Sequence, residues 1–215
     1  EGKSVKLNRD LKLTIPVKDV FSINTFNEYF QISKTFVPKN RLKAKPKSLT
    51  ILWDASYSMQ YKKIDEELVI ISDYLKYLEN VKVTLITFSN ATILNKTYRI
   101  KNRNFEELIA DLKSTQYDGG TSYKNLIVPK SDETLLFSDG LHNLGSLDLS
   151  KETKLYCINS VSSSNHQLLE VLSSENSGNY INLNSISNKT AIELLNYESF
   201  KFLGVNHNNT IFEVY

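Results

Sequence analysis

Short apolar runs alternate along most of this chain with segments in which apolar residues recur at helical spacing. The first strong run, Leu49–Trp53, ends abruptly at Asp54. A run of this length that stops at a polar residue is typical of a buried strand. The apolar positions that follow step by four, three, four and three residues: Ile64, Leu68, Ile71, Leu75 and Leu78. The pattern therefore predicts a strand, a loop and then a helix of several turns.

The same alternation continues to about residue 198. Further strands are predicted at residues 81–88, 93–100, 133–139, 154–161 and 179–184. Further helices are predicted at residues 105–112, between Asn165 and Gly178, and around residues 190–195. Strands that alternate with helices at this spacing indicate an α/β fold with a mainly parallel sheet covered on both faces. The segment 93–100 follows a short turn, so it is expected to pair antiparallel with the strand before it.

Three polar residues are predicted to begin helices. Asn104 is followed three positions later by Glu107, the spacing of a capping box. Asn165 precedes the apolar pattern of the next helix, and Ser58 precedes that of the first. Asparagine and serine are favoured at such positions because their side chains accept hydrogen bonds from free backbone N–H groups.

The two ends of the chain lie outside this alternation. Residues 1–37 are predicted to be extended, with strand patterns at 11–17 and 29–37. The segment 38–48 has two prolines and five cations, and we interpret it as a solvated basic linker rather than a phosphate-binding run. Residues 199–215 resemble a β-hairpin. The predicted organisation is an extended β segment with the linker (1–47), a main domain (48–198) and a C-terminal hairpin (199–215).

Composition narrows the class of protein. The chain has 215 residues, of which 40% are hydrophobic. That is enough to build one sizeable core plus extra elements. Its 26 basic and 24 acidic residues give a net charge of +2, which favours neither nucleic acid nor an anionic membrane as a partner. The single cysteine, Cys157, excludes an internal disulfide. No membrane-spanning run or signal peptide is visible, and because the chain begins at Glu1 we expect it to be part of a longer multidomain protein.

Oxygen-bearing side chains gather at the ends of the predicted strands. Asp54 and Asp139 each end an apolar strand, so both are expected at the carboxyl edge of one sheet, with the hydroxyls of Ser56, Ser58 and Thr121 on neighbouring loops. Oxygen ligands suit a hard divalent cation such as Mg²⁺. If the hydroxyls bind directly, the aspartates can hold coordinated waters, and the metal keeps its electrophilic character. Its free position then favours a carboxylate, which indicates binding rather than hydrolysis.

Three motifs carry a family resemblance. D-A-S-Y-S-M (54–59), D-G-G-T (118–121) and S-D-G (138–140), in this order, resemble the metal-ion-dependent adhesion site of von Willebrand factor type A domains. The resemblance covers roughly residues 48–198. It implies a six-stranded, Rossmann-like doubly wound sheet of order 3-2-1-4-5-6 with the third strand antiparallel. It implies a site for Mg²⁺ (or Mn²⁺ or Ca²⁺) formed by Asp54, Ser56, Ser58, Thr121 and Asp139. It also implies a protein partner that presents a carboxylate, and an extracytoplasmic or cell-surface location.

The sequence departs from that family pattern in three places. Tyr57 replaces a common glycine, as it does in the inserted domains of integrin β chains. Gln60 and Tyr61 stand where integrins carry an acidic pair, so no second metal site is predicted. Asp139 follows Thr121 by only 18 positions, which leaves room for about two helical turns before Pro129.

The flanking segments carry a second, shorter resemblance. YFQISKTFVP (29–38) and IFEVY (211–215) are similar to segments that surround type A domains paired with a vault/inter-α-trypsin (VIT) domain. On this basis we expect residues 29–37 and 200–215 to meet as a small β-layer.

Other interpretations of the site residues remain open. Asp54 and Asp139 could be turn residues at strand ends, and Asp118 is interpreted as a turn former before two glycines. Tyr57 and Tyr123 could contact a partner or pack internally. The three histidines, interpreted as surface residues, have no spacing that indicates zinc binding or catalysis: His142, His166 and His207.

Three functions follow from these interpretations. The favoured one is a divalent-cation-dependent protein-binding module without enzymatic activity. One alternative is a purely structural type A domain with a degenerate metal site. The other is a metal-assisted hydrolase with Asp54 as nucleophile, against which Ser56 stands where a second acid is needed, and neither a glycine-rich phosphate loop nor a nearby base is evident.

Overall fold

The computed structural model describes residues 21–27, 29–34, 41–124, 126–142, 145–149, 153–198, 205–207 and 210–212. The chain divides into two compact units, Glu1–Arg41 and Leu42–Tyr215, and each is described by itself.

The described part of the first unit is a β-hairpin. Strands β1 (Phe21–Phe26) and β2 (Tyr29–Lys34) pair antiparallel, with Phe26 opposite Tyr29. Asn27 in the connecting turn has a φ of 51°. Asparagine tolerates this left-handed conformation better than most residues. The hairpin confirms the strand predicted at 29–37 as far as residue 34, whereas the strand predicted at 11–17 lies outside the described residues.

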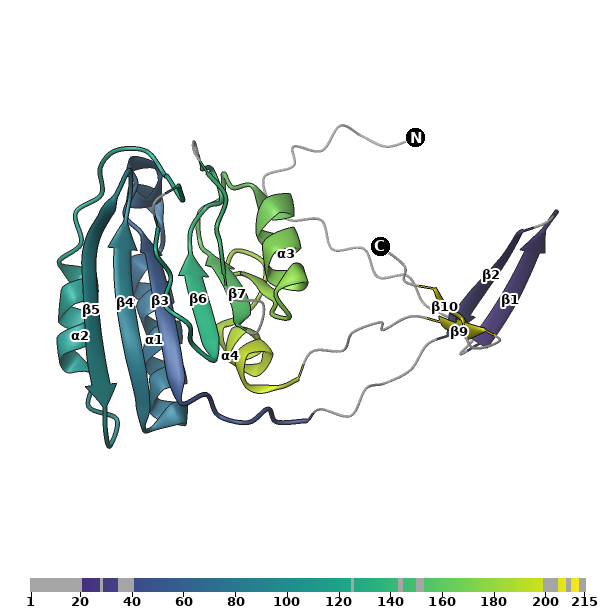
Figure 1. Ribbon diagram of the computed structural model, residues 1–215, viewed down its shortest axis with the longest axis horizontal. Coiled ribbons are helices and arrows are strands. Elements are labelled where there is room, and N and C mark those ends of the chain that lie inside the picture. Colours follow the sequence, from purple (N-terminus) through teal and green to yellow (C-terminus); the bar gives the residue numbers. More distant parts are fainter. Residues whose placement is uncertain are drawn as a thin grey trace, which may run out of the picture. The chain divides into compact units, whose positions relative to one another are not determined.

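A six-stranded sheet forms the centre of the second unit (Figure 1). Its strands are β3 (Ser48–Asp54), β4 (Val81–Phe88), β5 (Thr92–Ile100), β6 (Glu133–Phe137), β7 (Lys154–Asn159) and β8 (Tyr180–Asn182). Their spatial order is β5-β4-β3-β6-β7-β8, and all neighbours are parallel except β4 and β5. This is the predicted order 3-2-1-4-5-6 with an antiparallel third strand, and the α/β doubly wound fold class is confirmed.

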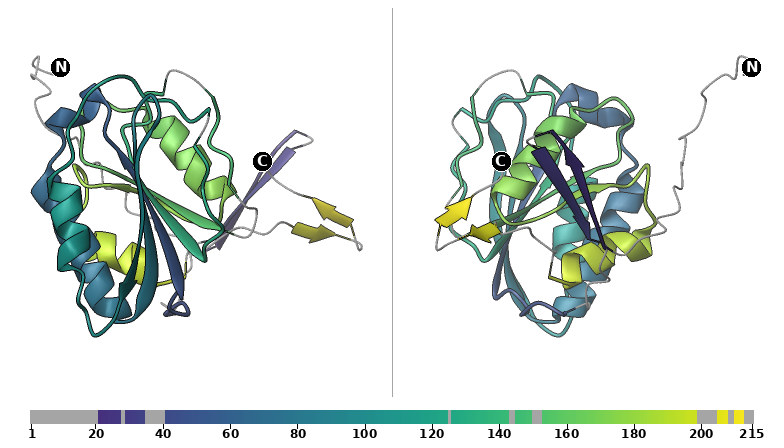
Figure 2. Two further views of the ribbon diagram at one scale, coloured as in Figure 1. Left: turned by 60° about the vertical axis from the view of Figure 1, so that its left-hand side comes forward. Right: turned by 90° about the vertical axis from the view of Figure 1, so that its right-hand side faces the viewer.

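Helices cover both faces of this sheet (Figure 2). They are α1 (Ile64–Leu78), α2 (Glu106–Lys113), α3 (His166–Glu175) and α4 (Asn188–Asn196). Successive strand residues alternate between the faces. Ile51 and Trp53 pack in the core on the side of α1, α2 and α4, whereas Leu52 packs in the core on the side of α3. This alternation of buried positions on both sides explains why the strands are almost continuously apolar.

Two helix starts differ from prediction. Helix α1 begins at Ile64 rather than near Ser58, because a 3₁₀ turn, η1 (Tyr57–Tyr61), comes first, and Ser58 caps neither helix. Helix α2 begins after Phe105 with no side-chain cap, so the capping box of Asn104 and Glu107 is wrong. The predicted cap at Asn165 is confirmed, since its Oδ1 accepts a hydrogen bond of 3.1 Å from the backbone N–H of Leu168.

The connection from Thr121 to β6 contains no helix in its described residues, 121–124 and 126–132. The two helical turns predicted there are therefore wrong. Instead, the buried ring of Tyr123 contacts that of Phe88, with ring centres 5.8 Å apart, and the backbone N–H of Leu126 donates to the carbonyl of Tyr123. Pro129 further along cannot supply the backbone donor that a helix needs.

The segment before β3 packs on the domain. Lys43 is buried and its Nζ lies 2.6 Å from Oε1 of Glu133, while its backbone N–H donates to the carbonyl of Asn196. Leu42 forms an isolated antiparallel bridge with Tyr197. Nζ of Lys45 donates to the carbonyl of Tyr77. This stretch is therefore anchored to the domain at Lys43, which is buried, whereas Leu42, Lys45 and Lys47 are exposed as expected of a solvated segment.

Near the C-terminus, β9 (Val205–His207) and β10 (Thr210–Phe212) pair antiparallel, which confirms a hairpin in the predicted segment. Whether the two end segments of the chain meet, and the division at residues 47 and 198, stay predictions. Among helices in the described part of the chain, none has both the length and the apolarity to span a membrane.

Candidate metal centre

Asp54 lies at the centre of the candidate site. It is the last residue of β3, the strand in the middle of the sheet, and its side chain is fully buried. Its Oδ1 accepts a 2.9 Å hydrogen bond from the backbone N–H of Ser56. Its Oδ2 accepts from Oγ of Ser138 at 2.7 Å and from Oγ1 of Thr121 at 3.4 Å. One carboxylate therefore joins three loops at the carboxyl edge of the sheet.

The two serine hydroxyls lie together beside Asp54. Oγ of Ser56, which is buried, is 3.3 Å from Oγ of the half-buried Ser58. Backbone hydrogen bonds fix the loop that carries them to the loop that contains Asp118 and Gly119. The N–H of Tyr57 donates to the carbonyl of Gly119 at 2.9 Å, and the N–H of Asp118 donates to the carbonyl of Ala55 at 2.9 Å. The 3₁₀ turn η1 begins at Tyr57, directly after this connection.

Thr121 is placed by a glycine turn. Gly119 has a φ of +76°, and a Cβ at this position would lie 2.7 Å from Nδ2 of Asn90. Gly120 N–H donates to Oδ1 of the same asparagine at 3.0 Å. Only glycine meets both requirements at position 119 without strain. The turn brings the buried Thr121 hydroxyl to Asp54.

Asp139 follows β6, the strand next to β3, and is also fully buried. Its Oδ1 accepts a 2.9 Å hydrogen bond from the backbone N–H of Leu141. Its Oδ2 is buried and has no hydrogen-bond partner among the described residues. A buried carboxylate oxygen without a partner is costly, so this atom calls for an explanation such as a bound ion.

Two buried carboxylates dominate the electrostatics of the site, and the charge of Asp54 also acts on the buried Lys62. Burial raises the pKa of the Asp54 carboxyl above its usual range. Hydrogen bonds from Ser138 and Ser56 oppose this shift, and the charge of Asp139 adds to it. Within the described part of the chain, neither aspartate forms a salt bridge.

A buried cation near the site already has its own partner. Nζ of Lys62 is 3.2 Å from Oε2 of Glu67 and 3.2 Å from the ring centre of Trp53. Burial lowers the pKa of Lys62 to about 8, while the charge of Glu67 opposes the shift. Glu67 in turn accepts a 2.6 Å hydrogen bond from Ser160 at the end of β7. This pair fixes the start of α1 against the sheet.

The donor set fits a hard divalent cation. Short contacts link Asp54, Ser56, Ser58 and Thr121, and Asp139 follows the adjacent strand. All five side chains are oxygen donors of the kind that Mg²⁺, Mn²⁺ and Ca²⁺ accept. Considering only the residues that the structure describes, no group of three or more His, Cys, Asp or Glu side chains could hold a metal ion. The candidate site depends on hydroxyls for the rest of its ligands, and the unpartnered Oδ2 of Asp139 is the atom that a cation would satisfy.

Tyr57 and Tyr123 are each predicted either to contact a partner at the rim or to pack internally, and the structure gives them different positions. Tyr123 is 3% exposed, and its ring contacts those of Phe88 and His142. It is a packing residue, and His142 is half-buried rather than a surface residue. Tyr57 is 57% exposed beside the two serines and is available to a partner.

Sequence reasoning gave no role to four residues of this region. Ser138 lies within the S-D-G motif, and a hydroxyl next to a predicted ligand is the signal that could have found it. Asn90 is bonded to a turn 30 positions away, and Lys62 and Glu67 pair on one short segment without a motif. No local sequence pattern indicates a role for Asn90, Lys62 or Glu67.

The comparisons with known proteins support the fold and do not assign a function. No protein-family model and no curated protein matches the sequence. An aerotolerance-related membrane protein from Bacteroides fragilis is similar in structure, with a TM-score of 0.50 and 14% identity over 68% of this chain and 94% of that chain. A von Willebrand factor type A from Catenulispora acidiphila gives 0.48 and 12%, over 70% of this chain and 41% of that one. The manganese-loaded TRAP protein of Plasmodium vivax gives 0.48 and 14%, over 73% and 74%.

Proposed function

We propose that the domain at residues 48–198 is a divalent-cation-dependent protein-binding module of the von Willebrand factor type A kind. The observation that carries this proposal is the pair of buried aspartates, Asp54 and Asp139, at adjacent strand ends, with no salt bridge in the described structure and with one unpartnered oxygen. A bound divalent cation balances that charge.

In this proposal the hydroxyls of Ser56, Ser58 and Thr121 bind Mg²⁺, Mn²⁺ or Ca²⁺ directly. Asp54 and Asp139 orient the hydroxyls and hold coordinated water. When bound, the metal supplies an electrophilic position for a carboxylate of the partner protein. Because its direct protein ligands are neutral, little of its charge is neutralised before the partner arrives, and the partner's carboxylate becomes its strongest ligand.

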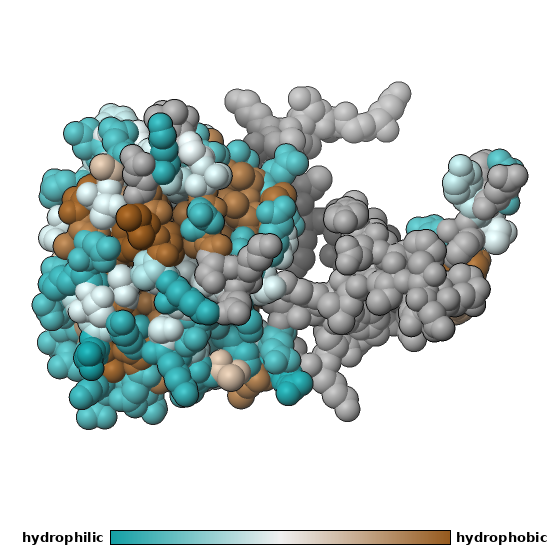
Figure 3. Space-filling view, in the orientation of Figure 1, coloured by the Kyte–Doolittle hydropathy of each residue, from teal (hydrophilic) through white to brown (hydrophobic). Residues whose placement is uncertain are grey.

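The surface around the site suits a protein partner. Tyr57 and Tyr61 of η1 are 57% and 73% exposed, and Leu141 next to Asp139 is 44% exposed. Figure 3 shows hydrophobic surface most extensively in the upper half of this unit, toward the carboxyl ends of β4 and β6. Aromatic residues such as these tyrosines are enriched at protein interfaces.

The wider setting belongs to the same proposal. Membership of the VIT-associated subgroup, and with it a longer multidomain chain, is supported by the sequence resemblance of residues 29–38 and 211–215. A cell-surface location is supported by the resemblance of the three motifs to type A domains. Two observations test this setting: the domain content of the full-length native protein, and the cellular compartment in which that protein is located.

Isothermal titration calorimetry with MgCl₂ and with MnCl₂ tests the metal site. We expect saturable binding in the wild type and its loss in Asp54→Ala. The matched control is Asp73→Asn, which removes a carboxylate from the exposed face of α1. A glutamate-containing peptide should then bind only in the presence of metal.

Other outcomes identify the alternatives. Hydrolysis of a generic phosphate ester that is lost in Asp54→Ala would favour a metal-assisted hydrolase. An absence of both metal binding and turnover would favour a purely structural domain. Either result would overturn the proposed binding function.

A further inference from the structure

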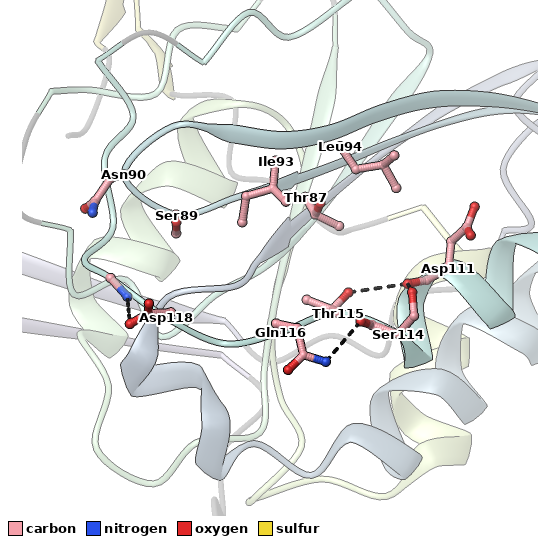
Figure 4. A pocket seen from close by; sticks show the side chains of 11 residues that line it. Thr87, Ser89, Asn90, Ile93, Leu94, Asp111, Ser114, Thr115, Gln116 and Asp118 are labelled. Carbon is pink, nitrogen blue, oxygen red and sulfur yellow. Dashed lines mark hydrogen bonds between the residues drawn. The ribbon is translucent and has the colours of Figure 1, made fainter.

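A pocket of about 490 Å³ opens beside the candidate metal centre (Figure 4). Its walls come from the end of β4, the start of β5 and the loop that leads from α2 to Thr121. The residues on which the argument depends are Asn90, Ile93, Leu94, Asp111, Gln116 and Asp118. No role has yet been given to this cavity.

The pocket and the metal centre share a wall. Asp118 and Gly119 line the pocket. Their backbones form hydrogen bonds with Ala55, which precedes the first metal-site serine, and with Tyr57, which lies between the two serines. Thr121 follows in the same loop. A single partner segment could therefore reach both places.

The charge of the lining is negative. It contains two carboxylates and no lysine or arginine. Asp111 is already compensated, because Nζ of Lys96 lies 2.6 Å from its Oδ2 and Tyr98 donates to the same oxygen. Asp118 differs: its Oδ1 accepts a 2.7 Å bond from the N–H of Gly119, and the described structure gives it no salt bridge. Asp118 is the free negative charge of the pocket.

Apolar surface accompanies this charge. Ile93 is 60% exposed and Leu94 is partly buried, and both line the wall formed by β5. The side chain of Gln116 and the hydroxyls of Ser114 and Thr115 add polar atoms on the opposite wall. A group that suits such a pocket has an aliphatic stem and a cationic end, as lysine and arginine side chains have.

We propose that this pocket is a second recognition subsite, which takes a basic side chain of the same partner whose carboxylate is bound at the metal. The stem lies on Ile93 and Leu94, and the cation pairs with Asp118. The bipartite part of this inference rests on the proposed function, whereas the basic specificity of the pocket does not.

The first test uses n-butylguanidinium, which reproduces an arginine side chain, with EDTA present so that the result is independent of the metal. We expect shifts of backbone amide signals confined to residues 87–94 and 111–120 in ¹⁵N-resolved NMR titrations. The neutral isostere n-butylurea should bind about two- to fivefold more weakly, because Asp118 is exposed and solvent weakens an ion pair there.

Asp118→Asn is the informative variant, because its side-chain oxygen can still accept the Gly119 N–H and preserve the turn. We expect about two- to fivefold weaker binding of n-butylguanidinium, with no change in Asp73→Asn. Equal binding of the two probes, equal effects of the two variants, or shifts elsewhere would overturn the inference.

The second test addresses the shared partner. With Mg²⁺ saturating, peptides that join aspartate to arginine through glycine spacers of increasing length are compared with the same peptides carrying citrulline. At least one arginine peptide should bind about two- to fivefold more tightly than its citrulline match. If none does while n-butylguanidinium still binds, the bipartite arrangement is overturned. If Mg²⁺ itself does not bind, the proposed function fails and the pocket result stands.

Discussion

The two ends of the central sheet both bury carboxylates, but they balance them differently. At the amino end of β6, Glu133 pairs with the buried Lys43 at 2.6 Å and accepts a 2.5 Å hydrogen bond from Tyr74. Nζ of Lys43 also donates to the hydroxyl of Tyr156. At the carboxyl ends of β3 and β6, Asp54 and Asp139 have neutral hydrogen-bond donors and no salt bridge in the described structure.

This difference separates a structural ion pair from a binding site. Burying a charge is unfavourable unless an opposite charge or a metal accompanies it. Lys43 supplies that charge from within the chain, and burial lowers the pKa of Lys43 while Glu133 opposes the shift. Asp54 and Asp139 at the carboxyl edge have hydroxyl and backbone N–H donors instead, and in the proposed function a cation from solution balances their charge.

Breaking the internal pair should have the largest effect. Glu133→Gln leaves Lys43 buried without its carboxylate, so the free energy of unfolding should fall by about 3–5 kcal/mol. Urea denaturation measures this change. Lys43→Met combined with Glu133→Gln should cost less than the sum of the two single changes. A loss below about 1 kcal/mol for Glu133→Gln would show that the pair is not a structural anchor.

Ser138→Ala tests the hydrogen bonds that hold the carboxyl edge. The change removes the 2.7 Å bond to Asp54 and the acceptor of the Gly140 N–H. Stability should therefore fall by about 1–3 kcal/mol. The matched control is Ser173→Ala in α3, a buried serine that bonds only to a carbonyl of its own helix. Equal losses by urea denaturation in both variants would assign Ser138 no special role.

Gly119→Ala tests the turn that positions Thr121. The φ of +76° disfavours any side chain, and the new Cβ would press on Asn90. Because a left-handed backbone is unfavourable for alanine, we expect a loss of about 1–2 kcal/mol. Adding Asn90→Ala should relieve the contact but leave the backbone strain. If Gly119→Ala had the same free energy of unfolding in urea as the wild type, the claim that this turn requires glycine would be contradicted.

Asp54→Asn should change stability least, and in the opposite direction from Glu133→Gln. Without metal it removes a buried, uncompensated charge, and an amide can still accept the Ser56 N–H and donate to hydroxyls. Urea denaturation in EDTA should give an unchanged free energy of unfolding or a gain of about 1 kcal/mol. A loss comparable to that of Glu133→Gln would mean that the carboxyl edge is balanced internally after all.

The fold could be predicted from the sequence because its signals are local. Apolar runs ending in aspartate and the spacing of Ile64 to Leu78 are visible within a few residues, and they were sufficient for the sheet order once the motif resemblance was added. Asp54 and Asp139 are found in the same way, because each stands where a strand ends. The structure places them on adjacent strands, whereas their role as metal ligands stays a prediction.

The remaining features depend on residues far apart in the chain. Lys43 and Glu133 lie far apart in the sequence, and only the order of the strands brings them together. No local pattern contains that order, so the sequence alone leads to the interpretation of the basic segment as a solvated linker. The missing helix after Thr121 is a tertiary effect of the same kind, since the burial of Tyr123 against Phe88 determines the path of the chain there.

The most direct test of the account is the free energy of unfolding in urea with EDTA, with Mg²⁺ and with Mn²⁺, for the wild type and for Asp139→Asn. A metal that binds only the folded state at about 100 times its Kd raises stability by about 2.7 kcal/mol. We predict a rise of this kind in the wild type and none in Asp139→Asn. Equal stability of the wild type in EDTA and in saturating metal would contradict the claim that the carboxyl edge of the sheet binds a cation.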